Sequence, residues 1–291
     1  MTDKSNVFYE RKGYHGTPNL PFARYSTIIP EFCNSYPMHW HEDIEIVIAW
    51  KGCCRYFVDF KEYLLKEGDI LVISPSMLHA FEQYNDSQYR GDTFVYSLSM
   101  LNFPTDDLCS TSIIRPLLKG DKILQPLISK DSYGYLPIRE NLIETITQMQ
   151  INNDYFEIIL KSLMMEFFYL CANSGYIIEK DSSLPFSGKY IKDVIEYINK
   201  NYASQITLED IASYAGVTPC HLAKAFKKAT GTTCFSYINE IRLSNAYEQL
   251  KKTNESVLSI AIENGFNNIS YFNRAFKKKY SCTPLECRNM N

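Results

Sequence analysis

The sequence predicts a multi-domain α+β protein, in which a β-barrel or sandwich with a pair of helices precedes an all-α region. Length is the first indication, because 291 residues are enough for about two domains. The second is a change from short strand-like segments before residue 101 to helical periodicity after residue 137. The third is a helix-turn-helix pattern that occurs twice near the end of the chain. We expect a first domain over 1–175, a linker over 176–188 and a second domain over 189–291.

The composition is that of a globular protein. Hydrophobic residues make up 45% and charged residues 22% of the chain, which argues against wholesale disorder or a fibrous repeat. No run approaches the roughly 20 apolar residues that a membrane-spanning helix needs. The polar start lacks the apolar segment of a secretory signal, so we expect a cytoplasmic protein. The nine cysteines contain no CxxC pair, which predicts reduced thiols and disfavours a zinc finger.

Five short segments rich in β-branched or aromatic residues predict the strands of the first domain. They are 25–29, 44–48, 55–59, 69–73 and 93–97. Regular short strands of this kind are typical of barrels and sandwiches. Ile44, Ile46 and Ile48 share one side of their strand, because side chains alternate along a strand. That apolar side must be covered by other elements of the protein.

Two amphipathic helices after Pro137 are the expected cover. Apolar residues recur every three or four positions from Ile138 to Met149, and again from Phe156 to Cys171. The second helix is apolar on more than one side, through Met164, Met165, Phe168 and Tyr169. Helices of this kind often pack against a partner, so we expect a homodimer joined through this helix. The alternative is a helix that is fully buried within one subunit.

Every segment after the linker is helical. Thr207 is expected to cap a helix over 208–215, with Asp210 at its third position, and Thr218 to cap the next helix, which begins with Pro219. The other helices are expected over 189–201, 234–252, 257–264 and 270–280, with a last one opened by Thr283.

The helix-turn-helix pattern is an internal repeat. Matching residues lie 49 or 50 positions apart: Ile211, Ala212, Gly216 and Thr233 correspond to Ile260, Ala261, Gly265 and Thr283. In the second helix of each copy, a buried stripe is expected from Leu222 and Phe226, and from Phe272 and Phe276. The opposite faces of these two helices are then free for other contacts.

Charge is divided unevenly along the chain. From Gly188 to Asn291 there are 14 Lys and Arg against 9 Asp and Glu, a net charge of +5, whereas the part before Gly188 has a net charge of −8. Such asymmetry suggests a nucleic-acid-binding module attached to another domain, although chance could produce it as well.

The region from Lys189 to Arg288 resembles the DNA-binding part of the AraC family of transcription regulators. The resemblance includes both helix-turn-helix copies, the linking segment Tyr237-Ile-Asn-Glu-Ile-Arg-Leu243 and the run from Tyr271 to Tyr280. Ser281 departs from the family pattern, which usually has glycine there. The resemblance implies a regulator that binds promoter DNA, and that contacts RNA polymerase if it is an activator. It implies no enzymatic activity.

In that family the second helix of each copy enters the major groove. Carried over by position, the DNA-contacting residues are Cys220, His221, Ala223, Lys224 and Lys227 in the first copy, and Ser270, Tyr271, Asn273, Arg274, Lys277 and Lys278 in the second. Arg274 is the best candidate to read a guanine, since its guanidinium can bond O6 and N7 together. Lysines such as Lys227 suit phosphates. The first copy has only Lys224 as a strong polar reader, so we expect the second copy to be more base-specific.

The first domain resembles a cupin barrel. His39-Trp-His41 with Glu45 and Gly52 resembles the first cupin motif, and Gly68–Pro75 followed by His79 resembles the second. Ser76 and Gln83 depart from the second motif, where glycine and asparagine are usual. The implied fold is a cupin-like barrel, and its implied effector pocket contains His39, His41, Glu45 and His79. Positions 39, 41 and 45 share parity, so we expect them to face the same side of one strand.

Two uses of these four residues are open. In the favoured interpretation they belong to a pocket for an organic effector such as a sugar, with no metal. In the alternative they hold a divalent metal, which three imidazoles and a carboxylate suit, and the protein is a metal sensor or a metal-dependent cupin enzyme. The 22 tyrosines and 17 phenylalanines fit a pocket that stacks on sugars and equally fit an aromatic core. Residues 1–20 are expected either to fold over the ligand as an arm or to be disordered.

Overall fold

The computed structural model describes residues 15–17, 19–31, 34–151, 154–180, 187–280 and 282–289. The greater part of the expected N-terminal arm, over residues 1–14, and the departure at Ser281 lie outside these residues. In the described part, no helix is long and apolar enough to cross a membrane. The cysteines described there are free thiols.

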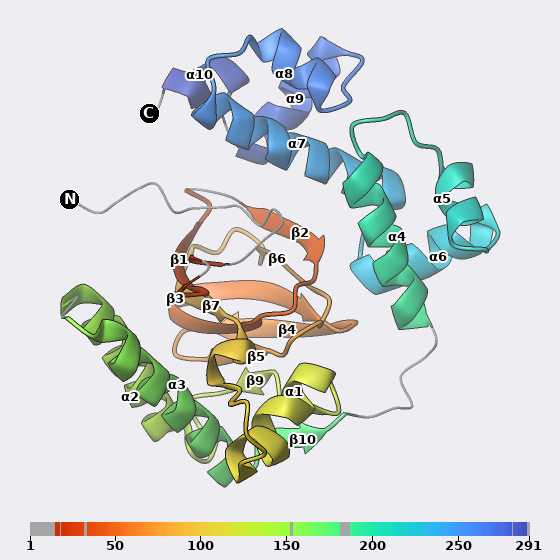
Figure 1. Cartoon of the computed structure of the whole chain (residues 1–291). Coiled ribbons are helices and arrows are strands. Elements are labelled where there is room, and N and C mark those ends of the chain that lie inside the picture. Colours follow the sequence, from red (N-terminus) through yellow and green to blue (C-terminus); the bar gives the residue numbers. More distant parts are fainter. Residues whose placement is uncertain are drawn as a thin grey trace.

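Antiparallel strands form the barrel of the first domain (Figure 1). They are β1 (Phe22–Ile29), β2 (Ser35–His39), β3 (Ile44–Val58), β4 (Lys61–Lys66), β5 (Ile70–Ile73), β6 (His79–Gln83), β7 (Tyr89–Tyr96) and β9 (Leu127–Ile128). One group of strands has the order β1-β7-β3-β5-β9, and β2, β4 and β6 form a second group that also contains β3. The predicted β-rich first domain is therefore observed.

The long strand β3 joins the two groups. The sequence predicts two separate strands here, but they are the halves of one 15-residue strand. Ile44–Ile48 lies in the group with β5 and β7, and Cys54–Val58 pairs with β4 and β6. Gly52, at the bend between the halves, has a φ of 74°, and a Cβ there would lie 1.8 Å from the carbonyl oxygen of Gln88. The glycine therefore permits a bend that does not end the strand.

Helices cover one face of the barrel, as predicted. α2 (Tyr135–Ile151) and α3 (Phe156–Asn173) share an apolar core with Ile44, Ile46 and Ile48 of β3. The domain is completed by η1 (Leu98–Leu101), η2 (Ser110–Ile114), α1 (Arg115–Lys119), β8 (Lys122–Leu124) and β10 (Ile177–Glu179). β10 pairs with β8, although it lies in the range expected to be a linker. The chain is thus still part of the first domain at Glu179.

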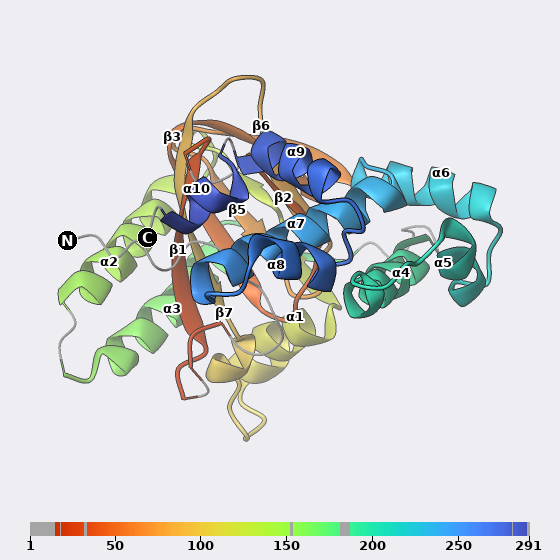
Figure 2. The same cartoon turned by 90° about the horizontal axis from the view of Figure 1, so that it is seen from above.

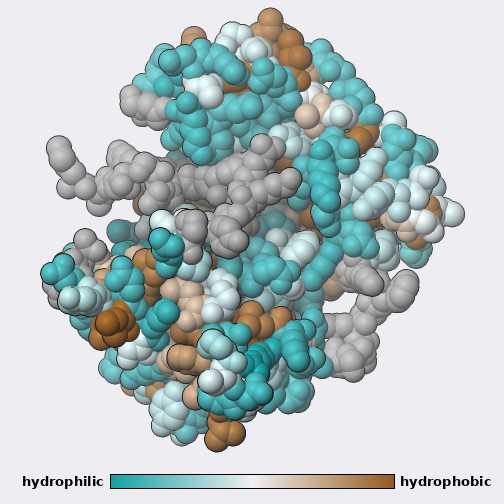
Figure 3. All heavy atoms as spheres, viewed as in Figure 1, coloured by the Kyte–Doolittle hydropathy of each residue, from teal (hydrophilic) through white to brown (hydrophobic). Residues whose placement is uncertain are grey.

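Burial along α3 corrects the expected partner surface. Phe168 and Met164 are 1% and 3% exposed inside the core shared with β3, and Met165 is partly buried against it. These three side chains are therefore packed within the subunit, because the helix uses a wide apolar face for intramolecular packing. By contrast, Tyr169 is 64% exposed and Ile158 is 69% exposed. Hydrophobic residues, brown in Figure 3, reach the surface at the lower left, where α2 and α3 lie.

The second domain is all-helical. Its helices are α4 (Ser187–Asn201), α5 (Leu208–Tyr214), α6 (Pro219–Thr230), α7 (Cys234–Lys252), α8 (Val257–Glu263), α9 (Ile269–Tyr280) and α10 (Pro284–Asn289). The capping box predicted at Thr207 is present, because its hydroxyl accepts from the backbone of Asp210, whose carboxylate accepts from the backbone of Thr207. Thr218 and Thr233 cap α6 and α7 with their side chains.

Two apolar cores lie towards opposite ends of α7. The first is built from α4, α5, α6 and the start of α7, and it includes Met38, Leu78 and Ala80 of the barrel. The buried side chains of the second lie between Leu243 and Cys287. Figure 2 shows α7 running across the barrel towards α4 and α6. The first helix-turn-helix unit therefore shares its core with the barrel.

Candidate functional site

The second helix of each helix-turn-helix unit has one buried face, as the repeat predicts. Leu222 and Phe226 of α6 are completely buried, and so are Phe272 and Phe276 of α9. The backbone N–H of Tyr271 donates to the side chain of Asn268, which caps the start of α9. Both helices are thus held by an apolar core and a side-chain cap, with their other faces turned to solvent.

The outer face of α6 carries the residues expected there. Cys220, His221, Lys224 and Lys227 are exposed, and Ala223 is half-buried. Ala223, Lys224 and Lys227 also line a groove of about 630 Å³ between α5, α6 and α7. The lysines bring positive charge to this face, and the small side chain of Ala223 lets another molecule approach the helix backbone.

The outer face of α9 is more polar. Ser270, Asn273, Arg274, Lys277 and Lys278 are all exposed. Tyr271 is 39% exposed, and its hydroxyl accepts a 3.0 Å hydrogen bond from Nδ2 of Asn239 on α7. This bond directs the hydroxyl of Tyr271 towards α7.

Arg242 connects the two helix-turn-helix units, a role that its sequence position does not reveal. It is 7% exposed, and its guanidinium donates to the carbonyl oxygens of Tyr202 at 2.7 Å and Ser204 at 2.8 Å. Gly265, in the turn of the second unit, lies so near that an added Cβ would be 2.9 Å from Nε of Arg242. The arginine therefore ties α7 to the loop after α4 and to the second turn.

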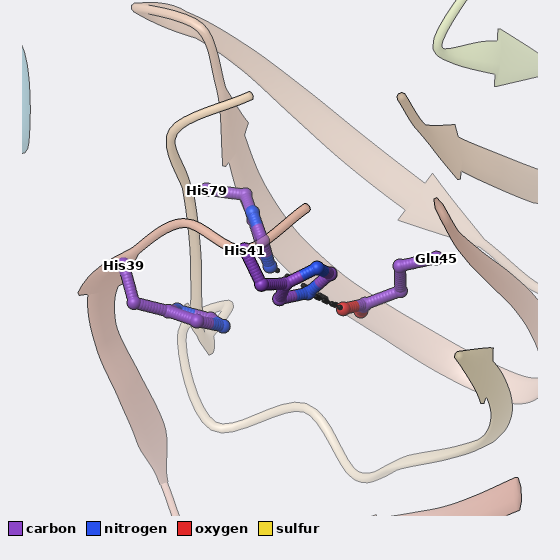
Figure 4. Close-up of side chains that lie close together, drawn as sticks. All are labelled: His39, His41, Glu45 and His79. Carbon is purple, nitrogen blue, oxygen red and sulfur yellow. Dashed lines mark hydrogen bonds and ion pairs between the residues drawn. The ribbon is translucent and has the colours of Figure 1, made fainter. Parts of the chain in front are cut away.

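In the barrel, His39, His41, Glu45 and His79 come together as the cupin resemblance implies (Figure 4). Their ligand atoms all lie within 4.8 Å of one another. Oε2 of Glu45 is 3.4 Å from Nε2 of His41 and 3.3 Å from Nε2 of His79. His39 pairs with His79 across β2 and β6. The expected placement on one strand was wrong, because β2 ends at His39 and β3 begins at Ile44, with His41 in the turn between them.

Backbone carbonyl groups orient all three imidazoles. Nδ1 of His39, His41 and His79 lies 2.9, 3.0 and 2.8 Å from the carbonyl oxygens of Pro37, Asp43 and Met77. A carbonyl oxygen only accepts, so each Nδ1 carries a proton.

Glu45 is ionised in this environment. Burial alone would raise the pKa of Glu45, but hydrogen bonds and positive charge from His41 and His79 outweigh that effect and hold the pKa well below its usual range. The cluster therefore pairs a buried carboxylate with two imidazoles that compensate for its burial.

His15 is a neighbour that sequence analysis missed. Its ring lies 5.3 Å from that of His41, and its Nδ1 is 2.9 Å from the hydroxyl of Tyr25. With His41 and Asp43 it forms a second, less buried group of potential metal ligands. His15 precedes the first strand and belongs to no recognisable motif, so the sequence carries no signal that would place it here.

The turns that carry the cluster contact the second domain. The hydroxyl of Tyr237, on α7, donates to the carbonyl oxygen of Met38, the residue before His39. Lys192, on α4, donates to the carbonyl oxygen of Ser76 and lies over the ring of Trp40. Ser76 in turn donates its N–H to the carbonyl oxygen of His41. Its φ of 63° explains why glycine is usual at this position in the cupin motif.

Comparisons with known proteins match both domains. A family model of the AraC-like ligand binding domain matches residues 33–168, and one of a helix-turn-helix domain matches residues 211–290. The HTH-type transcriptional regulator YdeC of Bacillus subtilis is 26% identical over 95% of this chain and 94% of its own length. The HTH-type transcriptional activator RhaS of Mannheimia succiniciproducens is 28% identical over 87% of this chain and 89% of its own. Among solved structures, ToxT of Vibrio cholerae has a TM-score of 0.49 at 16% identity, covering 92% of this chain and 98% of ToxT.

Proposed function

Because the chain belongs to the AraC family of transcription regulators, with a ligand-binding domain before its DNA-binding domain, we propose that it reads promoter DNA with the outer faces of α6 and α9. The observation that carries this proposal is the pair of matching helices, each with a buried apolar stripe and an exposed face with basic residues. Such helices fit the major groove. The net charge of +5 after residue 187 supports the same assignment.

The residues on the two helix faces contact different parts of the DNA. Arg274, with Ser270 and Asn273 beside it, reads base edges, since a guanidinium can make two bonds to guanine. Lys227, Lys277 and Lys278 contact phosphates. On α6, Lys224 is the main polar reader, and Cys220, His221 and Ala223 make close contacts of lower specificity. Tyr271 supports Arg274 and contacts the DNA backbone with the exposed part of its ring.

The functional unit is a homodimer in the cytoplasm. Its interface uses the exposed apolar residues of α3, Ile158, Ile159 and Tyr169, rather than the buried Phe168. Ile158 and Tyr169 are about three helical turns apart, so they lie on one side of α3. A dimer presents four recognition helices, which lengthens the operator and raises specificity. If the protein activates transcription, it also contacts RNA polymerase.

The barrel holds the small-molecule effector at His39, His41, Glu45 and His79. The many aromatic residues partly suggest an organic ligand such as a sugar, but several of those in the barrel, including Tyr56, Tyr89 and Phe94, are buried in the core. The polar cluster, rather than an aromatic surface, is therefore the feature that favours a ligand site. It lies beside the contacts with α4 and α7, where occupancy can affect DNA binding.

Selection from a random DNA pool tests the proposal. The full-length protein should enrich one sequence motif, and its affinity should fall steeply with salt, because basic residues displace counterions from DNA. Enrichment of no motif, together with no measurable binding at low salt, would contradict the assignment of α6 and α9.

A further inference from the structure

We propose that Cys282 and Cys287 form a reversible disulfide when the protein meets a small-molecule disulfide such as oxidised glutathione, and that this bond lowers the affinity of the protein for its operator. Cys282 lies just after α9 and Cys287 lies in α10, at the far end of the second domain from the barrel contact. The effect on DNA rests on the proposed function of α9, whereas formation of the bond does not.

The first support is the position of the two cysteines around the start of α10. The N–H of Thr283 donates to Oε2 of Glu286 at 2.7 Å, and the N–H of Glu286 donates to Oγ1 of Thr283 at 3.2 Å. This reciprocal pair makes Thr283 the cap, with Cys282 directly before it and Cys287 as the fourth residue of the helix. Side chains in these two positions often pack against each other when a helix begins in this way. In this chain both positions carry a thiol.

The second support is the contact between the thiols. The thiol of Cys287 donates a hydrogen bond to the sulfur of Cys282. Cys287 is 2% exposed, and Cys282 is partly buried against the same apolar core. Two sulfur atoms in hydrogen-bond contact need only a local approach to reach the roughly 2.05 Å of a disulfide. The bond can therefore form without a rearrangement of the fold.

The two thiols differ in access to solvent, which sets the order of the reaction. Cys282 is partly exposed, so it meets the small disulfide first. Its thiolate attacks one sulfur of that molecule, forms a mixed disulfide and releases one small thiol, which takes up a proton. Cys287 then loses its proton and attacks the sulfur of Cys282, which forms the internal disulfide and releases the second small thiol. In sum, the two cysteines lose two electrons and two protons, and the small disulfide gains them.

Burial protects the pair from rapid oxidation. It raises the pKa of both thiols, that of Cys287 to about 12. The hydrogen bond from Cys287 and the positive charge of Lys251 oppose this effect at Cys282 and favour its thiolate. The thiolate is the attacking species, and its fraction grows with pH. We therefore expect slow oxidation near neutral pH that accelerates as the pH rises.

The third support is the connection of the pair to the recognition helix α9. Cys282 follows Tyr280, the last residue of α9, by two positions. The ring of Tyr280 stacks on that of Tyr247 in α7 with centroids 4.4 Å apart, and lies 4.7 Å from the ring of Phe276. Cys287 is a buried member of the same core. The end of α9 and the start of α10 are therefore packed as one unit.

Movement of this unit affects the residues proposed to contact phosphates. Lys277 and Lys278 lie in the last turn of α9 and are exposed. Closing the disulfide draws Cys282 towards Cys287, and with it the chain that leaves α9. Because phosphate contacts fix the register of a helix on the duplex, a shift at this end of α9 should weaken DNA binding.

Oxidation of the reduced full-length protein tests the bond. The protein is treated with oxidised glutathione, and its products are followed by intact mass and peptide mapping. We expect a species lighter by two hydrogen atoms, in which Cys282 and Cys287 are linked, and full reversal by dithiothreitol. The rate should rise between about pH 7 and about pH 9. Glutathione adducts without an internal link, or a link between other cysteines, would overturn the proposal.

Matched variants test the pair. Cys282→Ser and Cys287→Ala should each abolish the internal disulfide, because either change removes one of the two sulfur atoms. Cys109→Ser, at an exposed cysteine of the first domain, should oxidise like the wild-type protein. If Cys287→Ala fails to fold, because this side chain is buried, Cys282→Ser at the more accessible position gives the same information.

Operator affinity, measured on the same samples, separates this inference from the proposed function. We expect oxidation to lower the affinity by about 5-fold or more in the wild-type protein and in Cys109→Ser, but not in Cys282→Ser. An equal loss in oxidised Cys282→Ser would assign the effect to another thiol, such as the exposed Cys220 on α6, and overturn the role of the pair. A disulfide with unchanged affinity would overturn the regulatory effect. A protein that forms the disulfide but binds no DNA when reduced would overturn the assignment of α6 and α9 instead.

Discussion

The hydroxyl of Tyr237 donates a 2.6 Å hydrogen bond to the backbone carbonyl oxygen of Met38. The two residues are far apart in sequence, one on the linking helix α7 and the other on β2. Tyr237 is completely buried, and burial raises the pKa of its hydroxyl, which therefore stays protonated and able to donate. One side chain of the DNA-binding domain thus contacts the backbone directly before His39.

Replacing Tyr237 with Phe should loosen this contact while preserving the shape of the side chain. The carbonyl oxygen of Met38 would lose its partner, which should lower the free energy of unfolding by about 1–3 kcal/mol in denaturant titrations. It should also reduce the effect of the barrel ligand on DNA affinity. Tyr133→Phe, at a position 77% exposed, is the matched control. Equal effects of the two changes would argue against a specific role for Tyr237.

Arg274→Ala should alter sequence preference rather than affinity alone. Loss of a bidentate contact to guanine should cost roughly 1–3 kcal/mol and broaden the selected motif at one position. If Lys227 contacts a phosphate as proposed, Lys227→Ala should leave the motif intact and reduce the salt slope by about 1. Selection from a random pool reports both variants. A uniform loss of affinity with an unchanged motif in Arg274→Ala would mean that this residue does not read a base.

A fragment containing residues 188–291 should bind the operator in gel-shift assays. The two helix-turn-helix units and the net charge of +5 both lie in it. Its stability should be lower than that of the intact protein, because Met38, Leu78 and Ala80 of the barrel would be missing from its first core. Binding of the operator by a 1–175 fragment instead would contradict the assignment of the domains.

Replacing both Ile158 and Tyr169 with glutamate should give a monomeric protein in sedimentation experiments. Both side chains are exposed on α3, so the change places charge on the proposed interface without disturbing the core. Phe168→Glu should instead destabilise the subunit, since it would bury an unpaired charge. A wild-type protein that is already monomeric at micromolar concentration would rule out this interface.

Local signals predicted the second domain well. Thr233 marks the start of α7, and its bounds at Cys234 and Lys252 are those expected from the sequence. The cap at Thr207 and the buried stripe of Phe272 and Phe276 likewise follow from residues a few positions apart. Such features depend on helix geometry alone, which a single sequence reveals through its periodicity.

Long-range packing could not be predicted in the same way. Nothing in the local pattern distinguishes Phe168, which is buried, from Tyr169, which is exposed. In the sequence, Gly52 lies between two predicted strands, but in the structure it lies within one continuous strand. The four residues of the barrel cluster were found through their motif, whereas their shared Nδ1 orientation depends on carbonyl groups that only the folded chain brings near.

The two apolar cores along α7 have a kinetic consequence. The first core includes side chains of the barrel, whereas the described buried members of the second lie between Leu243 and Cys287. The second helix-turn-helix unit is therefore the one that can engage DNA without disturbing the barrel. We expect α9 to contact the operator first. The residence time on DNA should lengthen only when α6 also binds. Single-molecule dwell times should then show a brief state and a long-lived state, with the ligand changing mainly the conversion between them.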